Sequence, residues 1–373
     1  MKSSSGEHYL GLDHLRAIVA FLVVSFHFCH QNDSGYLQHT QAPSFFPLAI
    51  LDQGHTGVAL FMTLSGYLFS KLLEGRDFSF KLFLFNRGLR LLPLLIVVVL
   101  INLIGRVLLG LPLEEFILDL IKGPLLPTLP NGGWSITVEM QFYIFLPLLL
   151  LALTKDLRWA SAIITFAMLV RLLVFLENVD LSHSAYYTIV GRIDQFVLGM
   201  AAARCRGFMV NKTWLAAGVF LSFGLFYWWF DGLGGKDNSP AWVNILWIVI
   251  PTIEGASYAT LIAYYDRNFR PENRGVSWFL GKAGQYSYSI YLLHFFFANE
   301  VAKFIHQNII PISNFYEAQI LAAVFFCFMM ILGLVSFTLI ESPFLKLRRK
   351  YIFPAASAPV SQESFAYKAA QSV

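Results

Sequence analysis

Two ionisable side chains in the first apolar segment, Arg16 and His27, have the spacing of groups that act on one path. Eleven residues at about 100° each return to within about 20° of the starting direction, so both project from one helix face, about 16 Å apart along the axis. Ionisable residues inside a membrane are costly and are candidates for function. Histidine exchanges a proton near neutral pH, which is what a sugar hydroxyl needs to become a nucleophile. A structural alternative stays open, in which Arg16 reaches lipid phosphates and His27 bonds a neighbouring helix.

A second group of polar residues precedes the fourth apolar segment. Residues 131–133, Asn-Gly-Gly, are typical of a turn, and Ser135 is suited to cap the helix that follows. Glu139 falls in the first turns of that helix, near the positive end of the helix dipole, where an ionised carboxylate can hold a histidine or orient a substrate hydroxyl. Trp134 is either an interfacial anchor or a surface on which a sugar stacks. The same pattern also occurs at ordinary helix starts.

Arginines elsewhere in the chain suggest phosphate binding. Arg87 and Arg90 are three residues apart and share a face if their segment is helical. Paired arginines bind phosphate well, although they serve equally as anchors at the membrane surface. Arg192 and Asp194 open the sixth apolar segment, where they form an ion pair or contact a substrate. Four further ionisable residues lie within apolar segments with roles that the sequence leaves open, namely His55, Arg171, Glu254 and His294.

The overall composition requires these groups to be positioned by helices in a bilayer. Of 373 residues, 57% are hydrophobic and only 13% are charged, whereas a typical soluble domain has about 25% charged residues. A soluble chain of this composition would expose much apolar surface to water, and a bilayer removes that cost. The net charge of +4 gives no indication of nucleic-acid binding. We therefore expect an all-α integral membrane protein.

Apolar stretches of the length that crosses a bilayer, about 20 residues, predict ten spans. They lie at residues 10–29, 45–70, 92–110, 136–153, 159–176, 187–204, 213–230, 241–263, 280–298 and 317–339. With ten spans both termini lie on one side, and the loops on that side hold nearly all Lys and Arg residues found outside the spans. The opposite loops hold only Lys122, Lys236 and Lys303, which predicts that both termini are cytoplasmic. The second stretch begins with polar residues and is expected to start as an irregular or re-entrant piece.

The chain is expected to be one membrane domain at residues 1–349 followed by a short disordered cytoplasmic tail at residues 350–373. The first apolar run lacks a cleavage site, which makes it a permanent span. The three cysteines show neither a paired nor a metal-binding spacing, so we expect no disulfide and no metal. No internal repeat indicates a transporter built from matching halves.

Six sequence elements, in their order along the chain, resemble those of acyltransferase family 3, a family of integral membrane acyltransferases. They are Leu12–Ala17 followed by His27, Gly57–Leu68, Arg87–Pro93, Trp134–Glu139 with Phe142, Tyr143 and Pro147, Tyr286–His294, and Glu341–Pro343. Met62 stands in place of a usual Phe. Ser342 stands where Arg is usual, which puts only a peripheral contact in doubt.

The resemblance implies transfer of an acyl group, usually acetyl, from cytoplasmic acyl-CoA to a carbohydrate beyond a cell membrane, the inner membrane if the source is bacterial. Acyl-CoA is a co-substrate, and no metal is implied. The residues assigned on this basis are His27 and Glu139 for catalysis, Arg16, Arg87 and Arg90 for acyl-CoA, and Trp134, Ser135, Arg192 and Asp194 for the acceptor.

Three alternatives to this function stay open from the sequence. They are an acyltransferase acting on a small-molecule glycoside at the cytoplasmic face, a transporter of a sugar or lipid-linked sugar, and a membrane protein without chemistry. Release of thiol from acetyl-CoA separates the first from the other two. A homo-oligomer and a separate extracytoplasmic partner are both compatible with the sequence.

Overall fold

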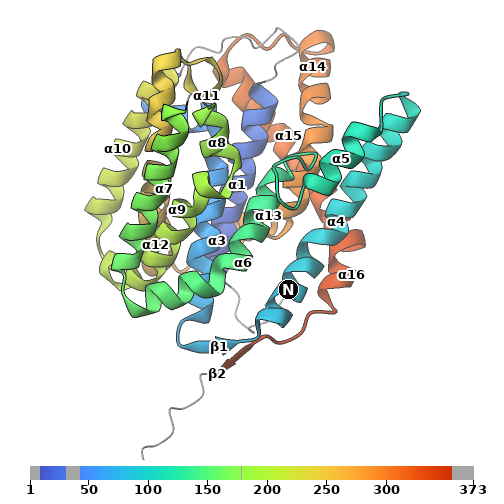
Figure 1. Ribbon diagram of the computed structural model, residues 1–373. Helices are drawn as coiled ribbons and strands as arrows, with labels where there is room; N and C mark the ends of the chain where they lie inside the picture. Colours follow the sequence, from blue (N-terminus) through green and yellow to red (C-terminus); the bar gives the residue numbers. More distant parts are fainter. Residues whose placement is uncertain (1–8, 31–42, 178, 355–373) are drawn as a thin grey trace, which may run out of the picture.

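Helices account for most of the described chain (Figure 1). The computed structural model describes residues 9–30, 43–177 and 179–354. The α-helices are α1 (Leu10–Cys29), α2 (Ala49–Asp52), α3 (Gly57–Leu73), α4 (Phe80–Leu108), α5 (Glu114–Lys122), α6 (Trp134–Lys155), α7 (Arg158–Leu176), α8 (Leu181–Tyr187), α9 (Ile189–Cys205), α10 (Thr213–Gly232), α11 (Gly235–Asn238), α12 (Ile250–Asn268), α13 (Gly275–Leu293), α14 (Ala298–Asn308), α15 (Phe315–Ser336) and α16 (Ser342–Leu345).

The remaining elements are short. Five 3₁₀ segments are η1 (Phe46–Leu48), η2 (Gly54–Thr56), η3 (Arg206–Met209), η4 (Ala241–Ile248) and η5 (His294–Phe296), and η6 (Phe337–Glu341) is a π-helical turn. Two strands, β1 (Arg76–Phe78) and β2 (Ile352–Pro354), form an antiparallel pair. The pieces η1, α2 and η2 precede α3, which confirms that the second predicted span begins irregularly. Strand β2 falls within residues 350–373, the range predicted as a tail, and residues 355–373 lie outside the described chain.

Seven helical segments of the described chain are long and apolar enough to cross a membrane, and η4 with α12, bent by 50°, makes an eighth. The chain is therefore a multi-pass membrane protein. Helices α9 and α13 occupy the other two predicted spans, 187–204 and 280–298. The count of ten and the cytoplasmic location of the termini stay predictions.

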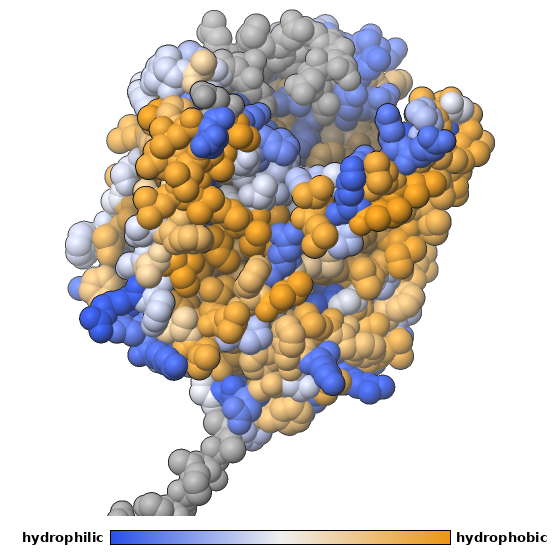
Figure 2. All heavy atoms as spheres, viewed as in Figure 1, coloured by the Kyte–Doolittle hydropathy of each residue, from blue (hydrophilic) through white to orange (hydrophobic). Residues whose placement is uncertain are grey.

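The surface of the bundle is apolar over most of its height. Figure 2 shows hydrophobic side chains covering much of the visible face, with hydrophilic side chains gathered toward the upper and lower ends. Large aliphatic side chains stand exposed on the long helices, among them Ile104 on α4 and Leu148 on α6. Such exposure is unfavourable in water and neutral in lipid, so these faces mark the hydrocarbon region.

The centre of the bundle is the contact between α3 and α9, and glycines set its distance. A Cβ atom on Gly66 of α3 would lie 2.0 Å from the carbonyl oxygen of Phe196 on α9. Reciprocally, a Cβ atom on Gly199 of α9 would lie 2.0 Å from the carbonyl oxygen of Thr63 on α3. Small residues permit this close approach of membrane helices. Because protein surrounds α9 on most sides, the helix tolerates polar residues that lipid would reject.

A second close contact holds α1 against α13. A Cβ atom on Gly284 would lie 1.9 Å from the carbonyl oxygen of Asp13. The contact fixes α1, which carries Arg16 and His27, relative to the helix that ends just before His294.

We predict that Gly199→Ala destabilises the bundle by about 1–3 kcal/mol, because the added methyl group forces α3 and α9 apart. Gly218→Ala on α10 is the matched control, since a Cβ atom there meets nothing within 4 Å. Thermal unfolding of the purified protein in detergent measures both. An unfolding temperature for Gly199→Ala equal to that of the control would contradict this account of the α3–α9 contact.

Candidate active site

A cavity of about 260 Å³ lies between α1, α3, α4, α6, α13 and the segment that follows α16. Its wall on α1 extends from Leu12 to Val23, which is about 16 Å along the helix axis. At one end it is lined by Tyr9, the residue that precedes α1, and by Tyr351 near β2. At the other end it is lined by Ser135 at the start of α6 and Tyr291 near the end of α13. The cavity therefore follows the bundle axis through much of its depth.

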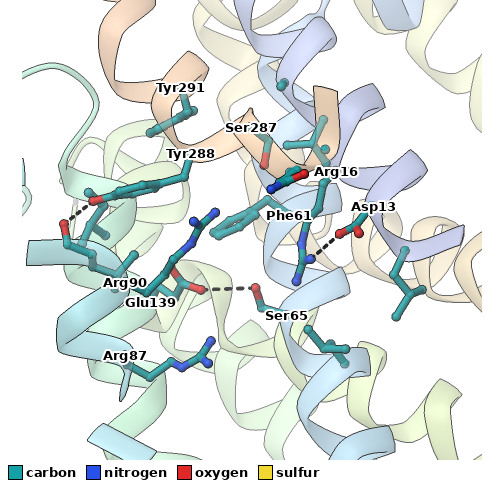
Figure 3. A pocket seen from close by; sticks show the side chains of 18 of the residues that line it. Asp13, Arg16, Phe61, Ser65, Arg87, Arg90, Glu139, Ser287, Tyr288 and Tyr291 are labelled. Carbon is teal, nitrogen blue, oxygen red and sulfur yellow. Dashed lines mark hydrogen bonds and ion pairs between the residues drawn. The ribbon is translucent and has the colours of Figure 1, made fainter. Parts of the chain in front are cut away.

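Four arginines line this cavity: Arg16, Arg87, Arg90 and Arg348. Figure 3 shows Arg16 on the α1 side and Arg87 and Arg90 on the α4 side. Arg16 pairs with Asp13 at 2.7 Å and Arg90 pairs with Glu341 at 2.5 Å. The three arginines that the sequence assigns to acyl-CoA thus come together, from two helices.

Glu139 faces the same cavity from α6. Its Oε1 atom accepts hydrogen bonds from Tyr143, one helical turn later, and from Ser65 of α3 at 3.4 Å (Figure 3). Glu139 is 6% exposed, and a buried carboxylate with these donors is held in one orientation. It forms no hydrogen bond to a histidine among the described residues, so its neighbours favour orienting a substrate group.

Ser135 lies at the far end of the cavity from Tyr351. Its hydroxyl donates to the hydroxyl of Tyr291 at 2.8 Å, which in turn donates to the carbonyl oxygen of Gly132 at 2.9 Å. Gly132 has a φ of +70°, and a Cβ atom on it would lie 2.6 Å from the ring of Phe295. Glycine is therefore required there both for the turn and for space.

His27 lies beside this end of the cavity, one helical turn beyond Val23. Its ring packs on Phe295, with centroids 4.5 Å apart, and its Nδ1 atom lies 3.2 Å from Nε2 of His294. Nδ1 of His294 lies 3.2 Å from the carbonyl oxygen of Ile290 and so carries the hydrogen. The hydrogen-bond pattern then places a hydrogen on Nδ1 of His27, which also lies 2.9 Å from the carbonyl oxygen of Val23. Nε2 is left as the basic nitrogen of His27.

A family model described as an acyltransferase domain, that of acyltransferase family 3, matches residues 9–339. The chain belongs to acyltransferase family 3. No curated protein and no solved structure matches it significantly.

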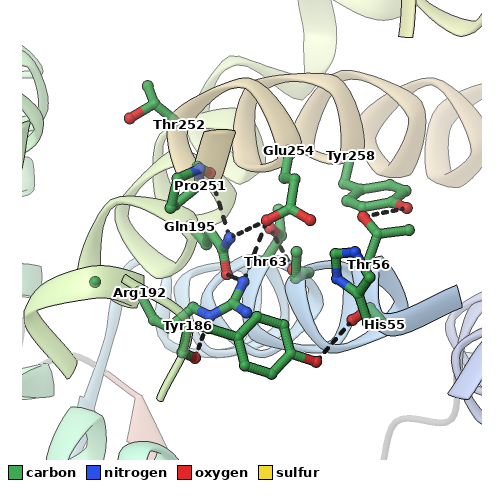
Figure 4. A network of polar contacts seen from close by, with 12 residues as sticks. His55, Thr56, Thr63, Tyr186, Arg192, Gln195, Pro251, Thr252, Glu254 and Tyr258 are labelled. Atoms are coloured by element: carbon green, nitrogen blue, oxygen red, sulfur yellow. Dashed lines mark hydrogen bonds and ion pairs between the residues drawn. The ribbon is translucent and has the colours of Figure 1, made fainter. Parts of the chain in front are cut away.

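The two remaining predicted site residues of this acyltransferase, Arg192 and Asp194, lie outside the cavity in a buried polar network (Figure 4). Arg192 pairs with Glu254 at 3.2 Å, and Asp194 pairs with Arg171 at 2.7 Å. All four side chains are at most 2% exposed. Both pairs are compensated charges within the bundle, which is the ion-pair alternative that the sequence left open.

Arg192 is nevertheless connected to the predicted acceptor end of the acyltransferase. Its Nε atom donates to the carbonyl oxygen of Tyr186 at 2.9 Å, and its guanidinium lies 4.3 Å from the Tyr186 ring centroid. The same ring packs against Trp134, with centroids 5.1 Å apart. Arg192 thus holds the aromatic side chain behind Trp134.

Sequence reasoning on the acyltransferase missed Tyr143, His294 as the partner of His27, and Arg348. Tyr143 had a usable signal, since it follows Glu139 by four residues on one helix face. The contact of His294 with His27 depends on how α1 packs against α13 and had no local signal. Arg348 stands in a basic run beside Arg349 and Lys350, which is typical of a membrane-surface anchor.

We predict that Arg192→Met destabilises the acyltransferase by about 3–5 kcal/mol, because Glu254 is left as an uncompensated buried charge. The double substitution Arg192→Met with Glu254→Gln removes that charge and is expected to recover much of the loss. Thermal unfolding of the three proteins measures the coupling. A stable single variant that has lost activity would instead show that Arg192 contacts substrate.

We predict that His294→Ala lowers kcat about tenfold, a part of what a general base contributes, because Nδ1 of His27 loses its acceptor. His294→Gln retains an acceptor and is expected to recover part of the rate. The exposed His183 provides a control, His183→Ala. The pH dependence of acyl transfer distinguishes positioning from packing, since only loss of positioning shifts the profile. An unchanged kcat and profile in His294→Ala would overturn this role.

Proposed function

We propose that this protein transfers an acetyl group from cytoplasmic acyl-CoA to a hydroxyl group of a cell-surface or lipid-linked carbohydrate. The observation that supports it is a single cavity within the bundle that joins four arginines to Ser135 and Glu139. Arginine suits phosphate because its planar group donates two hydrogen bonds at once. The carboxylate and hydroxyl groups suit a sugar hydroxyl.

The donor is proposed to enter from the end of the cavity lined by Arg16, Arg87 and Arg90. Acyl-CoA carries its phosphates at the nucleotide end, while its pantetheine arm is thin and its thioester is uncharged. The phosphates would stay with the arginines, and the arm would extend between α1 and α6 toward Ser135. Burial of the arm excludes water from the thioester and so limits its hydrolysis.

The reaction is proposed as direct transfer from thioester to hydroxyl. Nε2 of His27 accepts the proton of the sugar hydroxyl as its oxygen attacks the thioester carbonyl carbon. A new C–O bond forms and the C–S bond breaks, and the thiolate of CoA then takes the proton from His27. Glu139 is assigned to orienting the acceptor, because Ser65 and Tyr143 already hold its carboxylate within the cavity.

The acceptor is proposed to lie at the opposite end, against Trp134 and Ser135. Aromatic rings offer a flat apolar face to a sugar, and Trp134 is backed by Tyr186 and Tyr187. We assign Arg192 and Asp194 to support of this end rather than to direct contact, because both are engaged in buried ion pairs. The location in a bacterial inner membrane and the oligomeric state belong to the same proposal.

We predict that His27→Ala lowers acetyl transfer by about 10²–10⁴-fold, the usual contribution of a general base. Mass spectrometry of surface polysaccharide and glycolipid from cells with the wild-type chain, with His27→Ala and with no chain measures it. An acetyl-sized increment is expected only with wild type.

The other outcomes of this experiment each contradict a separate part of the proposal. An increment that persists in His27→Ala at equal protein level leaves the enzyme and removes His27 from catalysis. No glycan difference, together with thiol release from acetyl-CoA, indicates a small-molecule acceptor. No difference and no thiol release indicates a transporter or a protein without chemistry.

A further inference from the structure

The chain continues beyond the family match, which ends at residue 339, and the continuation reaches the cavity. After α16, residues 346–354 cross the end of the bundle near the start of α4 and finish in β2 (Figure 1). We call residues 346–354 the C-terminal strap. The proposed function does not use any part of it.

The C-terminal strap is anchored at several points. Strand β2 pairs with β1 in the loop between α3 and α4, with Asp77 opposite Phe353. The side chain of Asn86 makes two hydrogen bonds to the backbone of Arg349, at 2.7 Å to its carbonyl oxygen and at 3.0 Å to its amide. The amide of Ser79 donates to the carbonyl oxygen of Tyr351 at 2.9 Å. These bonds fix the strap against the first turns of α4.

This anchoring directs two strap side chains into the cavity. Tyr351 is 1% exposed, packs against Phe83 with ring centroids 5.6 Å apart, and lines the cavity wall. Arg348 lines the same wall near Arg87 and Arg90. Burial, together with the positive charges of Arg87 and Arg90, lowers the pKa of Arg348 to about 9.

The guanidinium groups at this wall have unused hydrogen-bonding capacity. The Nε atoms of Arg87 and Arg348 are buried and have no hydrogen-bond partner among the described residues. Buried donors are normally satisfied, and buried charges are normally paired. An anion held between the two side chains would meet both requirements. Arg349, the next residue, instead lies exposed with its guanidinium 5.5 Å from the ring of Phe85.

We propose that the C-terminal strap forms a wall of the donor site and that Arg348 binds a phosphate group of acyl-CoA. The inference rests on the proposed function, since it takes acyl-CoA as the donor. Arginine is suited to this task because it stays charged while buried and donates two parallel hydrogen bonds to a phosphate. The strap therefore contributes to affinity for the donor and leaves the transfer step itself to other residues.

The test compares Arg348→Gln with Arg349→Gln, which removes the same charge one residue away and outside the cavity. Equilibrium binding of CoA to the purified full chain in lipid nanodiscs is the readout. We expect Kd for CoA to rise about tenfold in Arg348→Gln, as for loss of one charge-assisted hydrogen bond. We expect it to stay within about twofold of wild type in Arg349→Gln. Equal Kd values for Arg348→Gln and wild type, or equal losses in the two variants, would overturn the proposal.

Two further arms separate other causes. In nanodiscs of zwitterionic lipid alone, the difference between the variants is expected to persist, and its disappearance there would show that Arg348 holds an anionic lipid headgroup. Hydrogen exchange of the wild-type chain tests the strap even if Arg348→Gln fails to fold. CoA is expected to slow amide exchange in residues 346–354, and unchanged exchange in a CoA-bound protein would overturn the proposal. Failure of the wild-type chain to bind CoA would instead refute the proposed donor.

Discussion

The energetic cost of placing charge inside an apolar bundle determines where every internal arginine lies. Arg171 and Arg192 meet it with carboxylates that are themselves fully buried, Asp194 and Glu254. Arg87 and Arg348 instead keep buried nitrogen atoms without a partner in the described chain, and both face the cavity. Compensated pairs need no ligand, because their charges already cancel, whereas the uncompensated groups are suited to receive one. This distinction separates the supporting network from the binding site.

The same constraint explains which helices lie at the centre. Helix α9 contributes Arg192, Asp194 and Gln195, all fully buried, and such residues would be expelled from a helix that faced lipid. The close α3–α9 and α1–α13 contacts surround these polar side chains with protein backbone. Polar function and central position therefore accompany each other. The long apolar helices α4, α7 and α15 form the boundary with the lipid.

Much of this arrangement could be predicted from the sequence because membrane solvation acts locally. Apolar length located the helices, and the family resemblance assigned Arg16, Arg87 and Arg90 to one ligand, whose common cavity the structure now describes. The second span was correctly expected to start irregularly, since polar residues cannot continue a lipid-facing helix.

The relations between distant segments could not be predicted in this way. The contact of His27 with His294 and the turn of Arg348 into the cavity both depend on tertiary packing. Neither leaves a periodic pattern in one segment. The pairing of Arg192 with Glu254 likewise joins two helices whose order in the chain says nothing of their contact.

The pairing of β1 with β2 has a consequence for the order in which the protein is made. Chains are synthesised and fold from the N-terminus, so β1 and the arginines of α4 enter the membrane long before β2 leaves the ribosome. Until then the cavity lacks the wall formed by Arg348 and Tyr351. The last described strand therefore acts as a late assembly step, and a nascent chain or a chain broken near its end carries the helices of the bundle with an incomplete pocket.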